Sequence, residues 1–380
     1  MSTSATHQER LARAALSRLS EPGDMRFTEL TTELGAVELH QHLLGQRHVN
    51  DLLQDVAMRL ADAQPERELE QAAKLGIRFV IPGDDEWPAQ LDDLAAAGEL
   101  HERGGVPIGL WVKGPLRLDT LAGSVAVVGS RSSTTYGDSV AGEIAAVAAS
   151  GGSPVISGAA FGIDQAAHRG AIAMDGPTVA VLACGADRVY PEAHARLIGH
   201  IAATGAVVSE APLGCAPQRV RFLARNRLIA ALGRGTVIVE AAVRSGALNT
   251  ANWANRLNRV VLGTPGPVTS ASSAGVHQLI RTGGAGLVTN GAEVLEALGA
   301  SGQHLLEDPR GPETARDGLS VRHRQVLDAV PVSSGARSDS VARAAGLGIV
   351  EVRRALAYLQ DRGLVEQSDG GWRLAALAHT

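Results

Sequence analysis

The sequence predicts an α/β protein whose main domain is a doubly wound, mostly parallel sheet, preceded by a small helical domain and followed by a winged helix. Three patterns lead to this prediction. Apolar runs of strand length alternate with helical periodicity between residues 125 and 266, residues 8–75 show helical periodicity alone, and residues 319–380 combine three short helices with a hairpin. We therefore divide the chain into an N-terminal helical domain (1–75), a central domain (76–300), a linker (301–318) and a winged-helix domain (319–380).

The composition is that of a globular protein with two or three domains. Of the 380 residues, 45% are hydrophobic and 20% are charged, which allows a sizeable core and excludes global disorder. Two cysteines are too few for a disulfide framework or a cysteine-rich metal site. The first residues lack the apolar segment of a signal peptide, and no stretch of about 18 apolar residues is present. We expect a cytoplasmic protein without a membrane span.

The central domain shows the alternation most clearly. Continuous Val/Ile/Leu runs are typical of strands buried on both faces, as in a parallel sheet covered by helices. Strands are expected at 125–130, 154–158, 178–185, 205–210, 236–241 and 259–266, with helices at 137–150, 162–173, 192–203, 222–232 and 246–257. Two further strands are expected before them, in GIRFVIPG (76–83) and PIGLWVKG (107–114). Ligands bind at the carboxyl ends of strands in such folds.

The flanking domains are predicted from shorter patterns. In the N-terminal domain, LARAALSRL (11–19) and VNDLLQDVAMRLAD (49–62) have helical spacing. Near the C-terminus, 338–347 and 349–363 form a helix-turn-helix pair after a helix at 321–330, and a hairpin turns at residues 369–371. The second helix of the pair could present Arg353 and Arg354 to duplex DNA, or the domain could bind another protein, or bind nothing.

The turn after the first central strand, Gly129-Ser130-Arg131, opens a helix. Backbone N–H groups and the helix dipole favour an anion at such a turn, and an arginine can add a bidentate contact. A standard dinucleotide site is not supported, because no Gly-x-Gly-x-x-Gly is present. The turn is either a phosphate site or a tight βα turn with an arginine on the surface.

A cationic window lies between Glu210 and Glu240, where no other acidic residue occurs. On a helix that starts near Pro217, one face would carry Arg219, Phe222, Arg225 and Asn226. Arginines spaced around one aromatic ring suit a nucleic-acid backbone with a stacked base. The alternative is that Phe222 belongs to the core and the arginines are solvated.

Other candidate residues have ordinary structural explanations. Asp164 and His168 share a helix face and could form half of a catalytic dyad, or be a helix-start carboxylate and a structural histidine. Glu240 could be a general base or a ribose ligand, or pair with one of the arginines. The sequence cluster of His40, His42 and His48 has no zinc-site spacing. We expect no metal and no cofactor.

Several segments together resemble one family. The motifs VAVVGSR, VISGAAFGIDQAAHRGA, VAVLACGADRVYP, FLARNRLIAAL and VIVEAAVRSGALNTA occur in the order and spacing of the bacterial DNA-processing protein A family, also called the Smf family. The resemblance is dense over residues 75–300. It is looser for the flanking domains, which are similar to the accessory domains common in the family, the N-terminal one being SAM-like.

The resemblance implies an extended Rossmann-like domain that binds single-stranded DNA, forms a homodimer and loads the RecA recombinase during natural transformation. It implies a binding role and not an enzymatic one. The alternative is a nucleotide-processing enzyme of the related phosphoribohydrolase type, whose Pro-Gly-Gly loop is absent from GRGTVIVEAA. Carried over to this sequence, the DNA-binding residues are Gly129, Ser130, Arg131, Ser157, Gly158, Arg219, Phe222, Arg225, Asn226, Arg227, Ser245 and Gly246.

Overall fold

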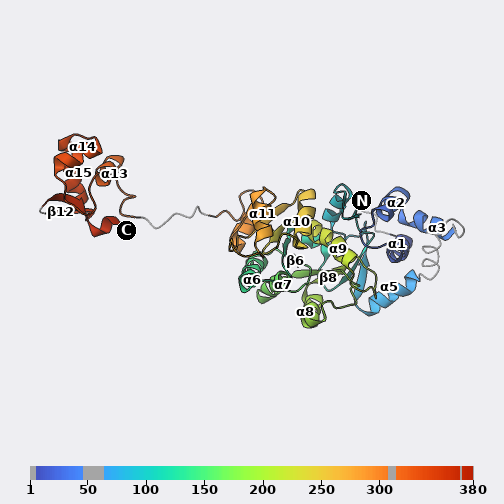
Figure 1. Ribbon diagram of the computed structural model, residues 1–380. Helices are drawn as coiled ribbons and strands as arrows, with labels where there is room; N and C mark the ends of the chain where they lie inside the picture. The colour runs from blue at the N-terminus through green and yellow to red at the C-terminus, as the bar shows by residue number, and fades with distance from the viewer. Residues whose placement is uncertain (1–5, 46–63, 307–313, 369, 380) are drawn as a thin grey trace. The chain divides into compact units, whose positions relative to one another are not determined.

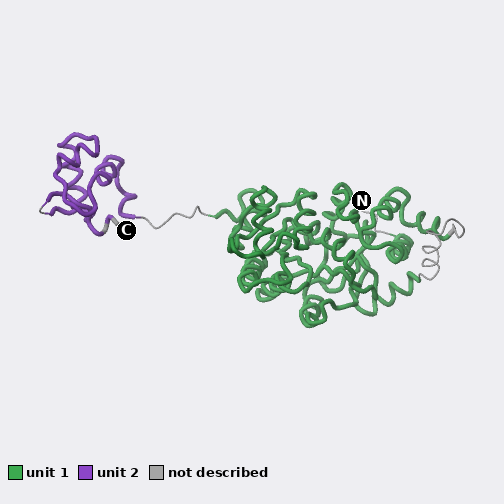
Figure 2. Tube along the Cα trace, in the orientation of Figure 1, with its two compact units in different colours: residues 1–306 green, residues 307–380 purple. Residues whose placement is uncertain are grey.

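A computed structural model describes residues 6–45, 64–306, 314–368 and 370–379. The chain forms two compact units, residues 1–306 and residues 307–380 (Figure 2). The helix expected at 49–62 and the linker residues 307–313 lie outside the described residues. Among the helices described, none has the length and apolar character needed to cross a bilayer.

The first unit is built on a nine-stranded sheet in the order β1-β4-β8-β7-β6-β5-β9-β10-β11. Its strands are β1 (Ile77–Val80), β4 (Leu110–Lys113), β5 (Val125–Val128), β6 (Val155–Ser157), β7 (Thr178–Leu182), β8 (Ala206–Ser209), β9 (Gly235–Ile238), β10 (Val260–Gly263) and β11 (Gly286–Leu287). The strands from β5 to β11 run parallel, and β4 alone runs in the opposite direction, because it pairs antiparallel with both β1 and β8. The predicted doubly wound, mostly parallel sheet is confirmed.

Strand order reverses between β5 and β9. From β5 the chain steps outward through β6 and β7 to β8, and from β9 it steps the other way through β10 to β11. This arrangement creates a topological switch point, where ligands of open α/β sheets usually bind. These strands end one to three residues earlier than the sequence predicts, so more of the Gly- and Ser-rich segments lie in loops at the carboxyl edge.

Helices cover both faces of this sheet (Figure 1). They are α6 (Thr135–Ser150), α7 (Ile163–Ala173), α8 (Ala195–Thr204), α9 (Arg219–Leu232), α10 (Ala247–Arg256), α11 (Ala274–Arg281) and α12 (Gly291–Leu298). Alternate residues of β5 face opposite layers: Val125 and Val127 pack with α6, α7 and α12, whereas Ala126 and Val128 pack with α9 and α10. Successive side chains point to opposite faces of the sheet, and both faces are buried. Every residue of the strand is therefore apolar.

The apolar segment 276–298 completes this sheet. It forms most of α11, then β11 and α12, and Val276 and Val294 are fully buried within the unit. These side chains are therefore not available to a partner.

The N-terminal helices pack against the antiparallel edge of the sheet. They are α1 (His7–Leu19), α2 (Met25–Leu34), α3 (Ala36–Gly45) and α5 (Pro65–Lys74). Ala14 of α1 and Ala72 of α5 share a buried cluster with Phe79 and Trp111 of β1 and β4. Arg10 forms a bidentate ion pair with Asp84, at 2.8 and 2.6 Å. Residues 6–45 thus belong to the same compact unit as the sheet.

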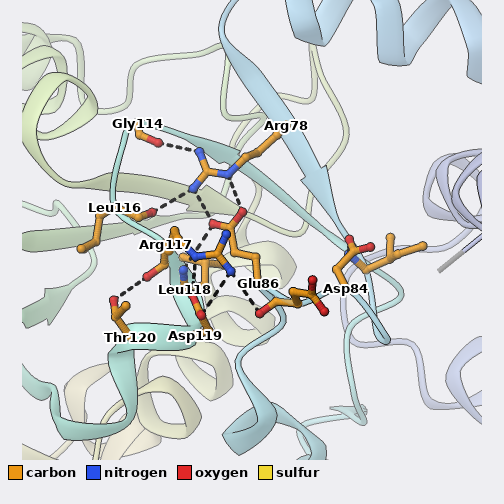
Figure 3. A network of polar contacts seen from close by, with 11 residues as sticks. Arg78, Asp84, Glu86, Gly114, Leu116, Arg117, Leu118, Asp119 and Thr120 are labelled. Atoms are coloured by element: carbon orange, nitrogen blue, oxygen red, sulfur yellow. Dashed lines mark hydrogen bonds and ion pairs between the residues drawn. The ribbon is translucent and has the colours of Figure 1, made fainter. Parts of the chain in front are cut away.

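A polar network fixes the segment between β1 and β5 (Figure 3). Arg78 of β1 donates to both carboxylate oxygens of Glu86, at 2.8 and 2.5 Å, and to the carbonyl of Leu116 at 2.8 Å. Glu86 also accepts a hydrogen bond from the backbone of Leu118. Arg78 thereby connects the segment after β1 with the segment after β4. A short antiparallel pair, β2 (Glu99–Leu100) and β3 (Arg103–Gly104), lies in the chain between these two segments.

The second unit has the element order of a winged helix. It contains α13 (Val321–Asp328), α14 (Ser338–Ala345), α15 (Ile349–Asp361) and the antiparallel pair β12 (Val365–Ser368) and β13 (Gly371–Leu374). Gly346 ends α14 in the left-handed region, at φ 64°, which allows the sharp turn into α15. Of the predicted hairpin turn, Asp369 lies outside the described residues.

Candidate nucleic-acid interface

A pocket lies at the carboxyl edge of the parallel strands. Loops that follow β5, β6 and β7 meet α9 there, because parallel strands end at the same edge of a sheet. The lining residues are Arg131, Gly158, Ala160, Phe161, Leu182, Ala183, Cys184, Tyr190, Pro191 and Phe222. The pocket walls therefore combine one guanidinium with three aromatic rings.

Arg131 and Phe222 meet in this pocket although they come from different motifs. The guanidinium carbon of Arg131 lies 4.7 Å from the centroid of the Phe222 ring, and the Tyr190 ring lies 5.7 Å from Phe222. A guanidinium at this distance is attracted by the negative face of the ring. Arg131 is exposed and Phe222 is half-buried. The pair therefore offers a phosphate contact next to a surface on which a base can stack.

Exposed arginines without a carboxylate partner gather at the same edge. In the described part of the chain, four such residues follow β5, β7, β8 and β9, and none of them forms an ion pair. They are Arg131, Arg188, Arg219 and Arg244. Unpaired cations on one edge of a protein whose net charge is −5 create a local positive field.

Helix α9 distributes the predicted residues over different environments. It begins at Arg219, two residues after the expected start, and exposes Arg219 and half of Phe222. Arg225, Asn226 and Arg227 are buried, with exposed fractions of 6%, 8% and 0%. The single exposed face expected from the sequence is therefore wrong: of the predicted residues on this helix, only Arg219 and Phe222 are not buried, and Phe222 alone lines the pocket.

Arg225 lies beneath the pocket. One of its terminal nitrogens donates to the carbonyl of Val181 at 3.1 Å, and its guanidinium carbon is 5.9 Å from the Phe222 ring centroid. Burial lowers the pKa of Arg225 to about 10, and the nearby Asp164 opposes that shift. The side chain remains protonated at pH 7. Its positive charge therefore lies directly beneath the pocket.

Arg227 is on the opposite side of the helix and is committed to the fold. Its two terminal nitrogens each donate to a carboxylate oxygen of Glu210 at 2.7 Å, and its Nε donates to the carbonyls of Gly104 and Gly105 at 3.1 and 3.0 Å. With no exposed surface, this guanidinium has no access to a nucleic acid. The prediction that Arg227 contacts DNA is therefore wrong.

The Ser157-Gly158 turn shapes the pocket floor. The Ser157 hydroxyl is buried and donates to the carbonyl of Val127 at 2.6 Å, so it does not face the pocket. Gly158 lies directly against the guanidinium of Arg225, and a Cβ at this position would overlap it. The glycine is therefore required by the close approach of Arg225.

Gly158→Ala is expected to destabilise the 1–306 unit by about 1–3 kcal/mol, because the added methyl forces Arg225 out of its site. The urea-unfolding midpoint measures this change. The matched control is Gly199→Ala in α8, where the added Cβ meets open space and the helix should be unchanged or stabilised by up to about 1 kcal/mol. Equal midpoints for the two variants would contradict the packing described.

Asp164 and His168 have separate partners. Asp164 accepts hydrogen bonds from the backbone of Gly158 and Ala160, at 3.2 and 3.4 Å, and burial raises its pKa. His168 bonds through Nδ1 to the Thr178 hydroxyl at 2.7 Å, and burial lowers its pKa to about 3. The two side chains hold the 158–162 loop and the adjacent strand, which supports the structural interpretation over a catalytic dyad.

Glu240 occupies the switch point between β5 and β9. Its carboxylate accepts hydrogen bonds from the backbone N–H and hydroxyl of Thr134, at 2.9 and 2.7 Å, and from the Ser272 hydroxyl at 3.1 Å. Its backbone carbonyl accepts the N–H of Ser130 at 2.7 Å. Of the roles considered for Glu240, pairing with an arginine is wrong: no described Arg or Lys forms an ion pair with it. Its carboxylate occupies the N-terminus of α6, where an anionic ligand would otherwise be favoured.

Ser245 and Gly246 serve the N-terminus of α10. The Ser245 hydroxyl accepts the N–H of Ala247 at 3.3 Å, and the Gly246 carbonyl accepts from the side chain of Asn226 at 3.4 Å. Asn226 also donates to Asn249 at 3.2 Å. The predicted residues Asn226, Ser245 and Gly246 therefore connect α9 with α10, and none of them lines the pocket.

Sequence reasoning missed three residues of the pocket wall. Phe161, Tyr190 and Cys184 were not selected, although two of the four phenylalanines and one of the three tyrosines of the chain meet here. The available signals were the scarcity of these residue types and the positions of Phe161 and Tyr190 shortly after predicted strands. Burial raises the pKa of Cys184 to about 11, so this thiol stays neutral at pH 7. Among the described residues, no group of His, Cys, Asp and Glu could hold a metal ion.

Fold and pocket define a class: a doubly wound, Rossmann-like protein with an arginine- and aromatic-lined pocket at the carboxyl edge of its sheet. The family model for DNA recombination-mediator protein A matches residues 78–299. The chain belongs to this family, which confirms the resemblance found in the sequence motifs.

Individual relatives agree with this assignment. The putative DNA processing protein DprA of Mycobacterium tuberculosis is 43% identical over 364 residues, which cover 95% of this chain and 93% of the relative. The crystal structure of DNA processing protein A from Streptococcus pneumoniae superposes with a TM-score of 0.62 at 30% identity, over 77% of this chain and 98% of that one. DNA processing protein A of Helicobacter pylori, described for its single-stranded DNA binding mode, gives a TM-score of 0.51 at 26% identity, over 58% and 95% of the two chains.

Proposed function

We propose that this protein binds single-stranded DNA at the pocket edge, protects incoming DNA and loads the RecA recombinase during natural transformation and DNA recombination. The observation that carries the proposal is the guanidinium of Arg131 placed 4.7 Å above the ring of Phe222. It combines a phosphate contact with a stacking surface in one pocket. The candidate DNA contacts are Arg131, Arg219 and Phe222, with Gly158 in the floor. Gly129 and Ser130 are left out, because the Ser130 N–H is bonded to the Glu240 carbonyl and the Glu240 carboxylate occupies the N-terminus of α6.

Single strands suit this surface better than duplexes. A base can stack on an aromatic ring only when it is not enclosed between its neighbours in a duplex. The exposed arginines contact phosphates without regard to sequence. The relative from Helicobacter pylori, similar in fold and 26% identical, is itself a single-strand binder, which supports the same ligand here.

RecA loading, the homodimer and the cytoplasmic location rest on family membership. The relatives are named for DNA processing, and the family for recombination mediation, and a mediator must contact both the strand and the recombinase. We propose a binding role without catalysis. Glu240, the residue on which a nucleotide-processing alternative depends, already has Thr134 and Ser272 as partners.

The test is fluorescence anisotropy with one oligonucleotide in single- and double-stranded form over a salt series. We expect tighter binding of the single strand, with a log–log salt slope of about −0.7 for each phosphate neutralised. Arg131→Ala should flatten the slope by about 0.7, because one phosphate contact is lost. Arg281→Ala, an exposed arginine in the last turn of α11, is the matched control and should leave the slope unchanged. Equal or tighter binding of the duplex would refute the proposal.

A further inference from the structure

Glu240 is a buried acid that the proposed DNA contact does not itself use. Its exposed fraction is 1%, and the hydroxyl and amide groups around it satisfy the carboxylate in place of a cation. A buried charge of this kind costs free energy unless several hydrogen bonds compensate it. The compensation comes from groups in two other loops.

These bonds bracket the turn that carries Arg131. On one side, the N–H of Ser130 donates to the Glu240 carbonyl at 2.7 Å. On the other side, Thr134 donates to the carboxylate through both its N–H and its hydroxyl. Arg131 lies between these two attachment points. Its backbone is therefore held at both ends by a single residue of the neighbouring loop.

The same carboxylate also joins the turn to helix α6 and to a third loop. The Thr134 hydroxyl caps α6 by accepting the N–H of Gly137 at 3.1 Å, and the carboxylate lies against Gly137, where no Cβ would fit. Ser272, in the loop after β10, donates to Glu240 at 3.1 Å. Three loops at the switch point are thus tied to one side chain, and Arg131 extends from the first of them toward Phe222.

We propose that Glu240 is a positioning residue for DNA binding: it fixes the 130–134 turn so that Arg131 stays over Phe222. The effect on DNA binding rests on the proposed function. The anchoring of the turn does not, because it is a property of the protein without DNA. Glu240 acts through Arg131 and does not contact the strand.

The chain contains a matched control for a purely structural carboxylate. Glu293 accepts the N–H and the hydroxyl of Thr289, at 2.6 and 2.8 Å, at the start of α12. This is the same pair of bonds that Glu240 forms with Thr134, in a segment that does not line the pocket. If Glu240 positions Arg131, removing the Glu240 carboxylate should weaken DNA binding, whereas removing the Glu293 carboxylate should not.

The experiment measures single-stranded DNA affinity and salt slope for the full chain with Glu240→Ala, Glu240→Gln and Glu293→Ala. Glu240→Ala should weaken binding about tenfold, as expected for one charge-assisted contact, and flatten the salt slope by up to about 0.7. Glu240→Gln should retain affinity within about twofold, because its amide can bond to the Thr134 N–H and to a hydroxyl. Glu293→Ala should bind as the natural protein does.

A double variant separates positioning from a general effect on the fold. Because Glu240 acts through Arg131, Arg131→Ala with Glu240→Ala should bind no more weakly than Arg131→Ala alone. Additive weakening, or wild-type affinity of Glu240→Ala, would overturn the proposal. If the unaltered protein binds no single-stranded DNA, the proposed function fails, and amide hydrogen exchange in the DNA-free protein decides the inference. Faster exchange across 130–134 in Glu240→Ala supports it, and unchanged exchange overturns it.

Discussion

Replacing Arg227 by alanine is expected to lower the free energy of unfolding of the 1–306 unit by about 3–5 kcal/mol. The change removes a fully buried guanidinium and leaves the carboxylate of Glu210, only 10% exposed, without its cation. The carbonyls of Gly104 and Gly105 lose their donor as well. Unpaired buried polar groups carry the full cost of their lost hydration.

The measurement is the urea-unfolding midpoint followed by tryptophan fluorescence. Three of the four tryptophans, Trp87, Trp111 and Trp253, belong to this unit. The control is Arg219→Ala in the same helix, where an exposed arginine without an ion pair should change stability by less than about 0.5 kcal/mol. Similar midpoints for the two variants would show that Arg227 is not the buried anchor described.

A compensated pair isolates the cause. Arg227→Met keeps much of the side-chain volume but strands the Glu210 charge, whereas Arg227→Met with Glu210→Gln leaves no buried charge. Glutamine at 210 can still accept the N–H of Gly23, which Glu210 accepts at 3.3 Å. The double variant should therefore be more stable than Arg227→Met alone. If it is less stable, lost packing and not the stranded charge explains the effect.

The sheet could be predicted from the sequence because both of its faces are covered. Burial on both sides makes β5 and its parallel neighbours continuous apolar runs, and the helices between them keep their own periodicity. The Gly-Ser-Arg turn was predictable for a related reason. The end of a parallel strand fixes which edge the next residues occupy. Arg131, which follows the first strand of the parallel sheet, is consequently predicted at the carboxyl edge, where the structure has it.

The environment of individual polar residues could not be predicted. Helical spacing places Arg219, Phe222 and Arg225 within reach of one another, but it does not reveal that Arg227 is sealed by two glycine carbonyls from another segment. Glu240 is a similar case, because Thr134 is brought to it only by the β5–β9 pairing. Contacts between residues so far apart in the sequence leave no pattern in local periodicity. Burial of a strand does leave one, as a run of apolar residues.

Replacing Phe222 by alanine is expected to weaken single-stranded DNA binding by about 1–3 kcal/mol, or roughly 5- to 150-fold, through loss of base stacking. The ring is half-buried and faces both Arg131 and Tyr190, so it is the central surface of the pocket. The salt slope should change little, because a neutral ring releases few counterions. A weaker affinity at constant slope is therefore the signature that separates this residue from the arginines.

Phe222→Tyr is the matched control, since it keeps a ring on which a base can stack and should bind within a few-fold of the natural protein. Both variants are first compared for their thermal midpoint, because the alternative interpretation places Phe222 in the core. A half-buried ring at the pocket edge should cost less stability than the about 3–5 kcal/mol of a core Phe→Ala change. If Phe222→Ala unfolds the domain, or binds DNA with full affinity while folded, the stacking role is wrong. If the slope also falls by about 0.7, the ring acts chiefly by holding the Arg131 guanidinium, and the phosphate contact then depends on the cation–π pair.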